Sequence, residues 1–135
     1  MRIQDIATLK TGAVLSRLHK AETGGNLYRV LSLRNIDDDV GAIEAQSCVP
    51  MRFTEKISDE FLTQKEDILL RLSAPYTVVY IEDDSDVGLL IPSHFAMIHA
   101  VGVDAKYLYA MLDSDEIRKQ LFIEGSASTT LAKIS

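Results

Sequence analysis

Short apolar runs, each closed by a turn-forming residue, are the feature of this sequence that most restricts its fold. They are rich in Val, Ile, Leu and Tyr and end at Gly, Asp, Pro or Ser, which is the pattern of β-strands. We expect strands at residues 7–11, 27–33, 67–73, 76–82, 88–91 and 95–101. Residues 68–70 and 78–80 are apolar at successive positions, so part of the sheet should be covered on both faces or curled on itself.

A tight turn connects two of these runs. The turn at residues 73–76 is too short for a crossover helix, and Pro75 suits a turn, so strands 67–73 and 76–82 should form a hairpin. A helix should begin at Asp104, a good N-cap, and it carries an apolar face at Leu108, Met111 and Leu112. Ser114 should cap a second helix with an apolar stripe at Ile117, Leu121 and Phe122. The sequence therefore predicts an α+β fold, with a mixed, strongly curved β-sheet packed against a few short helices.

The size of the chain favours one domain. Its 135 residues are 47% hydrophobic, which is enough for one core of ordinary density, so we expect a single domain over residues 1–135. No stretch approaches the roughly 18 apolar residues of a membrane span, and the first residues lack the layout of a signal peptide. We therefore expect a cytoplasmic protein with no membrane partner.

The charge is unevenly distributed. The net charge of −6 has the wrong sign for binding nucleic acid by bulk attraction. Residues 1–35, however, hold six basic and two acidic residues, a net charge of +4 that leaves −10 for the remainder. This asymmetry permits a basic face on an acidic body.

Metal-binding patterns are not found in the sequence. His19, His94 and His99 lack the spacing of metal ligands, and the single Cys48, which we expect to be buried, can form neither a thiolate cluster nor an internal disulfide. The acidic runs 37–39 and 82–86 lack the spacing of a calcium loop, so we interpret both as solvated turns. We expect no metal site.

Catalytic patterns are not found either. The sequence has no nucleophile elbow, phosphate-binding loop or dinucleotide fingerprint. Glu66 and Asp67 are adjacent in a strand and should point to opposite faces, so they cannot converge on one substrate. We expect a binding protein with no catalytic residues and no cofactor, although a site assembled from distant residues would escape such a search.

Four segments that follow one another over nearly the whole chain carry a resemblance to a known family. They are residues 6–12 with Ser16 and Arg17, residues 28–36, residues 65–76, and residues 104–112 with 125–126 and 130–131. Each segment alone is weakly specific, but their order and spacing resemble the target-recognition domain in the specificity subunit of type I restriction-modification systems.

The resemblance implies a module that reads one half of a split target in double-stranded DNA. Such a module directs methyltransferase (modification) subunits, and through them the restriction subunit, and does no chemistry itself. Reading DNA requires contacts to phosphates and to base edges. The residues that we expect to make them are Lys10, Arg17, Arg34, Arg71, Ser73, Tyr76, Ser126, Ser128 and Thr129.

Two groups of these residues have a structural alternative. Arg71 interrupts an apolar run, so it either faces a polar surface or pairs with a nearby Asp or Glu. Ser126, Ser128 and Thr129 lie in a small polar segment that would serve equally as a connecting loop.

The sequence departs from the family after this domain. In the family a long helix follows, pairs with another helix and holds the methyltransferase subunits, whereas this sequence stops at Ser135. We therefore expect either a fragment or a chain without the assembly function. A single copy should form a homodimer, or act beside a second recognition domain, to read a two-part site.

Two other functions remain open. One is a protein-interaction domain that keeps the specificity-subunit fold without binding DNA on its own, and an exposed apolar patch would favour it. The other is a small hydrolase or transferase with an unrecognised site, which a deep pocket lined by perturbed carboxylates would favour.

Overall fold

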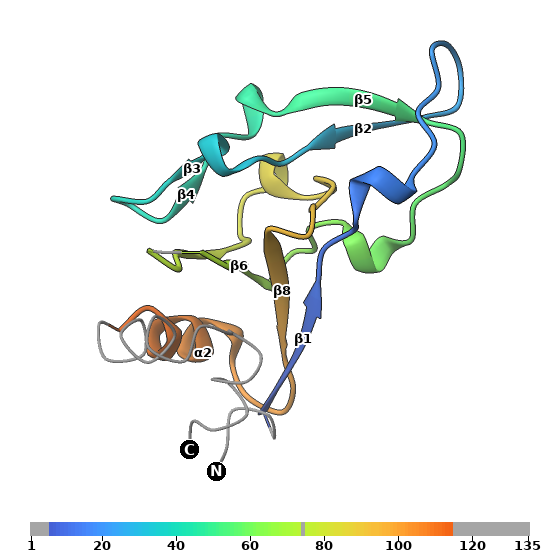
Figure 1. The fold of residues 1–135 in the computed structure, drawn as a ribbon. Coiled ribbons are helices and arrows are strands. Elements are labelled where there is room, and N and C mark those ends of the chain that lie inside the picture. Colours follow the sequence, from blue (N-terminus) through green and yellow to red (C-terminus); the bar gives the residue numbers. More distant parts are fainter. Residues whose placement is uncertain (1–5, 74, 115–135) are drawn as a thin grey trace.

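The computed structural model describes residues 6–73 and 75–114 of the chain (Figure 1). These residues form an α+β fold with eight strands, five 3-10 helices and one α-helix. None of the helices in the two described ranges is long and apolar enough to cross a membrane. The second helix expected after Ser114 and the late polar loop lie outside the described residues.

Four antiparallel strands form the central sheet, in the order β1-β8-β6-β7. Their bounds are Ala7–Thr11 for β1, Phe95–Ala100 for β8, Ile68–Arg71 for β6 and Val78–Tyr80 for β7. The predicted strands 7–11, 67–73, 76–82 and 95–101 are thus confirmed, with shorter bounds in all but the first. The predicted hairpin is also confirmed, because β6 pairs antiparallel with β7 from Ile68 opposite Tyr80.

Two smaller antiparallel pairs complete the β structure. One joins β2 (Asn26–Val30) to β5 (Val49–Phe53), and the other joins β3 (Ile36–Asp37) to β4 (Ala42–Ile43). The predicted strand 88–91 is wrong, because this segment makes only isolated bridges at Leu90. All strand pairs in the described residues are antiparallel, and parallel pairing occurs only at isolated bridges such as Val30 to Leu90, so the prediction of a mixed sheet is wrong.

Strands β6 and β7 and most of β8 are buried on both faces, as the apolar runs predict, whereas the edge strand β1 is half-buried to exposed. Helix α2 (Ala105–Leu112) covers one face, where Leu108 and Leu112 pack with Ile68 and Leu70. Asp104 caps this helix as expected, since its side chain accepts a hydrogen bond from the Lys106 amide at 2.7 Å. Each fully buried leucine contributes about 1.5–3 kcal/mol to folding.

The other face of the sheet is covered by the segments that connect the smaller strands. Leu69 of β6 packs there with Phe95 and Met97 of β8 and with Leu31 and Cys48. The expected burial of Cys48 is confirmed, and this burial raises the pKa of its thiol. The 3-10 helix η3 (Ala45–Ser47) contributes the buried Ala45 to this cover.

The β2–β5 pair, which we call the ribbon, packs on a third cluster through one face only. Val30 and Phe53 are buried there with Ala13, Ile57 and Leu90. The hydroxyl of Tyr28 accepts a hydrogen bond from the Ile57 amide at 3.0 Å. Figure 1 shows the ribbon lying across the molecule, far from α2.

Candidate nucleic-acid interface

A hollow of about 650 Å³ lies at the end of β2, between two 3-10 helices, η1 (Leu15–Arg17) and η2 (Leu33–Asn35). Its apolar wall is formed by Val14, Leu15, Val30, Leu31, Leu33 and Pro92. Its polar groups come from Ser16, Ser32, Arg34, Ser93 and His94. No lining residue is acidic, although 20 of the 135 residues in the chain are Asp or Glu. The hollow is therefore a local exception to the acidic character of the protein.

Close backbone contacts position η1 against the segment before β8. The amide of Ala13 donates to the Ile91 carbonyl at 2.7 Å, and Ala13 bridges Pro92 in parallel. A Cβ at Gly12 would lie only 2.1 Å from the Pro92 carbonyl oxygen. Only glycine fits at this approach, which explains why a Gly follows β1 where the chain turns toward η1.

A buried asparagine shapes η2 and turns its arginine outward. The side-chain oxygen of Asn35 accepts hydrogen bonds from the Ser32 amide at 2.9 Å and the Ser32 hydroxyl at 2.7 Å. Because Asn35 is buried, Arg34 beside it is left on the surface, at the rim of the hollow.

Two arginines, one that lines this hollow and one next to a lining residue, have no acidic partner among the described residues. Arg34 lines the hollow and Arg17 directly follows the lining residue Ser16, and both are exposed. Within residues 6–73 and 75–114, neither side chain makes a hydrogen bond or an ion pair. Each guanidinium thus offers five N–H donors, which suit phosphate oxygens and guanine edges. Arg34 and the exposed His94 both line the hollow, whereas Arg17 is placed beside it only through its neighbour Ser16.

Lys10 lies elsewhere. It is on β1, and its ammonium nitrogen lies 2.9 Å from a carboxylate oxygen of Glu60. It lines a different, smaller hollow of about 230 Å³ that also contains Asp59, Glu60 and Asp67. Its charge is balanced by acidic neighbours, so the DNA contact predicted for Lys10 stays a prediction without support from its surroundings.

Arg71 forms the ion pair that was its structural alternative. Its Nη1 lies 2.7 Å from Oδ2 of Asp38, and its Nε donates to the hydroxyl of Ser73 at 3.1 Å. The Arg71 side chain is only 18% exposed. Asp38 also accepts a hydrogen bond from the buried Thr77 hydroxyl, so it lies in a turn as predicted, but its side chain, which is 33% exposed, is only partly solvated. The arginine thereby ties β6 to the β3–β4 turn, and its contact with DNA stays a prediction.

The remaining predicted DNA contacts do not line the hollow beside Arg34. Ser73 is exposed and accepts the bond from Arg71, while Tyr76 is half-buried against the cluster under α2. Ser126, Ser128 and Thr129 lie outside the described residues.

Two arginines that the sequence analysis did not single out as contacts are exposed on the ribbon. Arg29 lies between Tyr28 and Val30, which face the core, so the alternation of β2 was a usable signal for its outward direction. No sequence signal indicated an outward direction for Arg52, because the segment that forms β5 contains Pro50, which is unfavourable within a strand.

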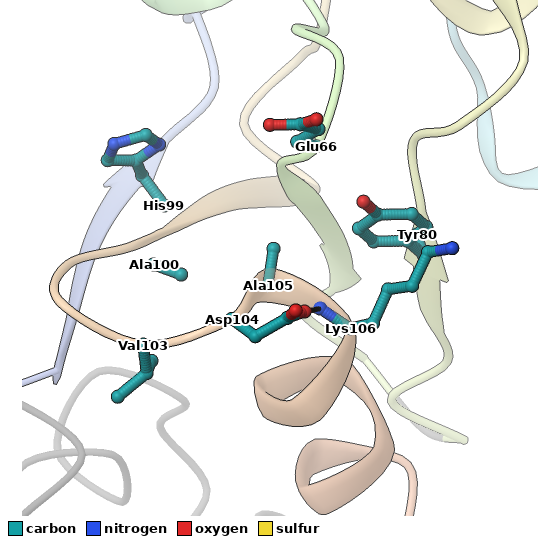
Figure 2. A pocket seen from close by; sticks show the side chains of 8 residues that line it. All are labelled: Glu66, Tyr80, His99, Ala100, Val103, Asp104, Ala105 and Lys106. Atoms are coloured by element: carbon teal, nitrogen blue, oxygen red, sulfur yellow. Dashed lines mark hydrogen bonds between the residues drawn. The ribbon is translucent and has the colours of Figure 1, made fainter.

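A second hollow, of about 400 Å³, lies at the start of α2 and has a different chemistry (Figure 2). Glu66, Tyr80, His99 and Asp104 line it, and the Lys106 side chain extends toward Tyr80. The Lys106 nitrogen lies 3.5 Å from Glu82 and 6.0 Å from the Tyr80 ring centroid. Burial, with the charge of Glu66, raises the pKa of Tyr80. Two carboxylates against one paired lysine make this hollow unfavourable for phosphate.

A histidine–aspartate pair borders this second hollow. Nδ1 of His99 lies 2.7 Å from Oδ1 of Asp67, whose side chain is only 12% exposed. Glu66 lines the hollow of Figure 2 and Asp67 lines the smaller one beside Lys10. The prediction that they are adjacent in a strand is wrong, because β6 begins at Ile68 and Glu66 lies in a turn with φ of 72°. In the part of the chain that the structure describes, no three His, Cys, Asp or Glu side chains are grouped to hold a metal ion.

A comparison with protein-family models and with curated proteins gives no match for this chain. The function is therefore inferred from the sequence motifs and from the arrangement of these side chains.

Proposed function

We propose that this chain is the DNA-recognition module of a type I restriction-modification specificity subunit. In this role it directs methyltransferase and restriction subunits, in the cytoplasm, to one half of a split target, and it is not an enzyme. A strongly curved sheet of the target-recognition type is part of the same proposal. The order of the four resembling segments along the sequence supports it.

The hollow between η1 and η2 is the observation that carries the proposal. In a chain of net charge −6, an acid-free hollow that is lined by Arg34, with Arg17 next to the lining residue Ser16, is favourable for an anionic ligand, because neither guanidinium group has a partner among the described residues. Phosphates of the DNA backbone would be held by Arg17, while Arg34 and His94 lie where a base edge or a second phosphate would meet the polar rim.

The net negative charge of the protein limits its affinity for DNA. Nucleic-acid binding rises with the number of phosphates neutralised, and two or three cations neutralise few of them. We therefore propose that the methyltransferase subunits, and a homodimer partner or second recognition domain, supply much of the affinity. The module itself supplies the choice of sequence.

The test is selection from a pool of random double-stranded DNA at two salt concentrations, by the chain alone and with type I methyltransferase subunits. The wild-type chain should enrich a short motif. Arg34→Ala and Arg17→Ala should each weaken binding and reduce the slope of log affinity against log salt by about 1, because each removes about one phosphate-equivalent contact.

The matched control is Lys65→Ala. Lys65 is exposed and pairs with Asp84, away from the hollow, so its removal should leave the slope unchanged. If the wild-type chain retained no DNA at low salt under either condition, the proposal would be wrong, and a protein partner would become the better explanation of the fold.

A further inference from the structure

The outer face of the ribbon is open, and its residues follow from the pairing register. Leu27 lies opposite Arg52 and Arg29 lies opposite Pro50, so these four side chains share one face. Leu27, Arg29, Pro50 and Arg52 are all exposed. The alternate residues Tyr28, Val30 and Phe53 face the core, so a protein cluster already occupies the other side.

The charge of this open face is positive and is not balanced by described carboxylates. The ten residues of β2 and β5 include two arginines and no acidic residue. Arg29 donates to the Gln46 carbonyl at 3.5 Å, and Arg52 donates to the Gly24 carbonyl at 3.3 Å. Each contact orients a guanidinium group through one nitrogen and leaves its charge and its other donors available.

The inner face of the ribbon packs on the core, and its edge is poorly suited to pairing with a further strand. Tyr28 and Phe53 pack together across the ribbon, with ring centroids 6.3 Å apart, and both contact the third core cluster. Lys20 bridges Phe53 beside β5. Pro50 lacks the N–H that an added strand would need. The face with the arginines, and not the edge, is therefore the surface that the ribbon offers to a partner.

We propose that the outer face of the ribbon enters the major groove of double-stranded DNA, where Arg29 and Arg52 each bind a guanine edge. This inference rests on the proposed function and adds a reading surface to it. The major groove accepts a two-stranded ribbon, and a bidentate arginine on guanine O6 and N7 is its commonest specific contact.

The spacing of the two arginines and the apolar side chain beside them support double-stranded DNA as the ligand of this face. Diagonal neighbours on an antiparallel pair lie roughly 7–8 Å apart, close to two base-pair steps of about 3.4 Å, so both arginines can reach bases of one short site. Leu27 is 54% exposed beside Arg52 and offers an apolar contact for a thymine methyl group. The deep, narrow major groove of an RNA duplex would not admit the ribbon.

The experiment compares the motifs selected by wild type, Arg29→Ala, Arg52→Ala, Arg29→Lys and Arg52→Lys from the same random DNA pool. Each alanine variant should lose the preference for guanine at one position by about tenfold or more. Each lysine variant keeps the charge but not the planar fork. The lysine variants should therefore keep the salt slope and still lose most of that preference.

Thermal unfolding checks that each variant still folds. Both arginines are exposed and donate only to backbone carbonyls, so their replacement should leave the fold intact. Lys65→Ala serves again as the charge control. Duplex RNA of the selected sequence should compete poorly with the DNA.

The outcomes separate the two proposals. If wild type enriches a motif and all four arginine variants enrich the same motif equally well, the ribbon inference is overturned while the proposed function stands. Equal competition by duplex RNA, or lysine variants with unchanged base preference, would also overturn major-groove reading. If wild type selects no DNA, the proposed function fails and the ribbon inference fails with it.

Discussion

The central sheet and the ribbon are built from strands of similar length, but they differ in how many faces are covered. In the sheet, Ile68 and Leu70 are buried under α2 and Leu69 is buried on the other side. In the ribbon, residues of only one face reach the core. The inner strand β6 therefore has little side-chain surface to offer a ligand, whereas the ribbon presents a whole face.

The arginines of the two regions differ in the same way. Arg71 in the sheet is largely buried and paired with Asp38, whereas Arg29 and Arg52 on the ribbon are exposed and contact only carbonyls. A charge that is desolvated needs a counter-charge, and a charge that stays in water does not. An unpaired surface arginine is therefore the more informative sign of a binding site in this protein.

The largest difference between the regions should appear when the same residue type is truncated in each. Leu70→Ala removes a side chain that is only 1% exposed and should lower the free energy of unfolding by about 3 kcal/mol. Leu27→Ala, at 54% exposure on the ribbon, should change it by less than about 0.5 kcal/mol. Urea denaturation measures both, and similar losses would contradict the one-sided burial of the ribbon.

The next effect concerns the polar network of the sheet. Asp38→Ala leaves the largely buried Arg71 and the buried Thr77 hydroxyl without their acceptor and should cost about 1–3 kcal/mol of stability. A double-mutant cycle with Arg71→Ala measures the coupling directly, and a coupling energy near zero would show that the pair does not stabilise the fold. The same Arg71→Ala chain tests the predicted DNA contact, which requires a reduced salt slope.

The smallest effect should come from the surface pair that fastens the chain before β2 to the end of β5. The His19 amide donates to Glu55 at 2.6 Å, and this bond, with the His19 side chain, lowers the pKa of Glu55 below its ordinary 4.5. A lowered folded-state pKa means that ionised Glu55 stabilises the fold above 4.5, and that this contribution disappears as the pH falls through the lowered value.

Glu55→Gln should therefore reduce stability slightly at neutral pH and not at all in acid. Thermal unfolding of both chains, well above and well below pH 4.5, checks the sign. A larger loss in acid than at neutral pH would contradict it.

Local patterns predicted the elements whose environment is uniform along their length. The apolar runs at 68–70 and 78–80 predicted β6 and β7 and the burial of both sheet faces. Asp104 predicted the start of α2, because capping depends on neighbouring residues alone. For Arg71 the sequence left open a polar surface or an acidic partner, and it could not identify that partner, since Asp38 lies 33 positions away.

The sequence by itself determined the α+β class, the hairpin, the helix cap and the burial of Cys48, because each depends on residue type and short-range spacing. Only the tertiary structure decided that β5 exists, that residues 88–91 make bridges in place of a strand, and that Arg34 and His94 line one acid-free hollow. These features arise from contacts between distant segments, and the physical reason is that strand pairing and charge neutralisation are fixed by the partner that folding brings close.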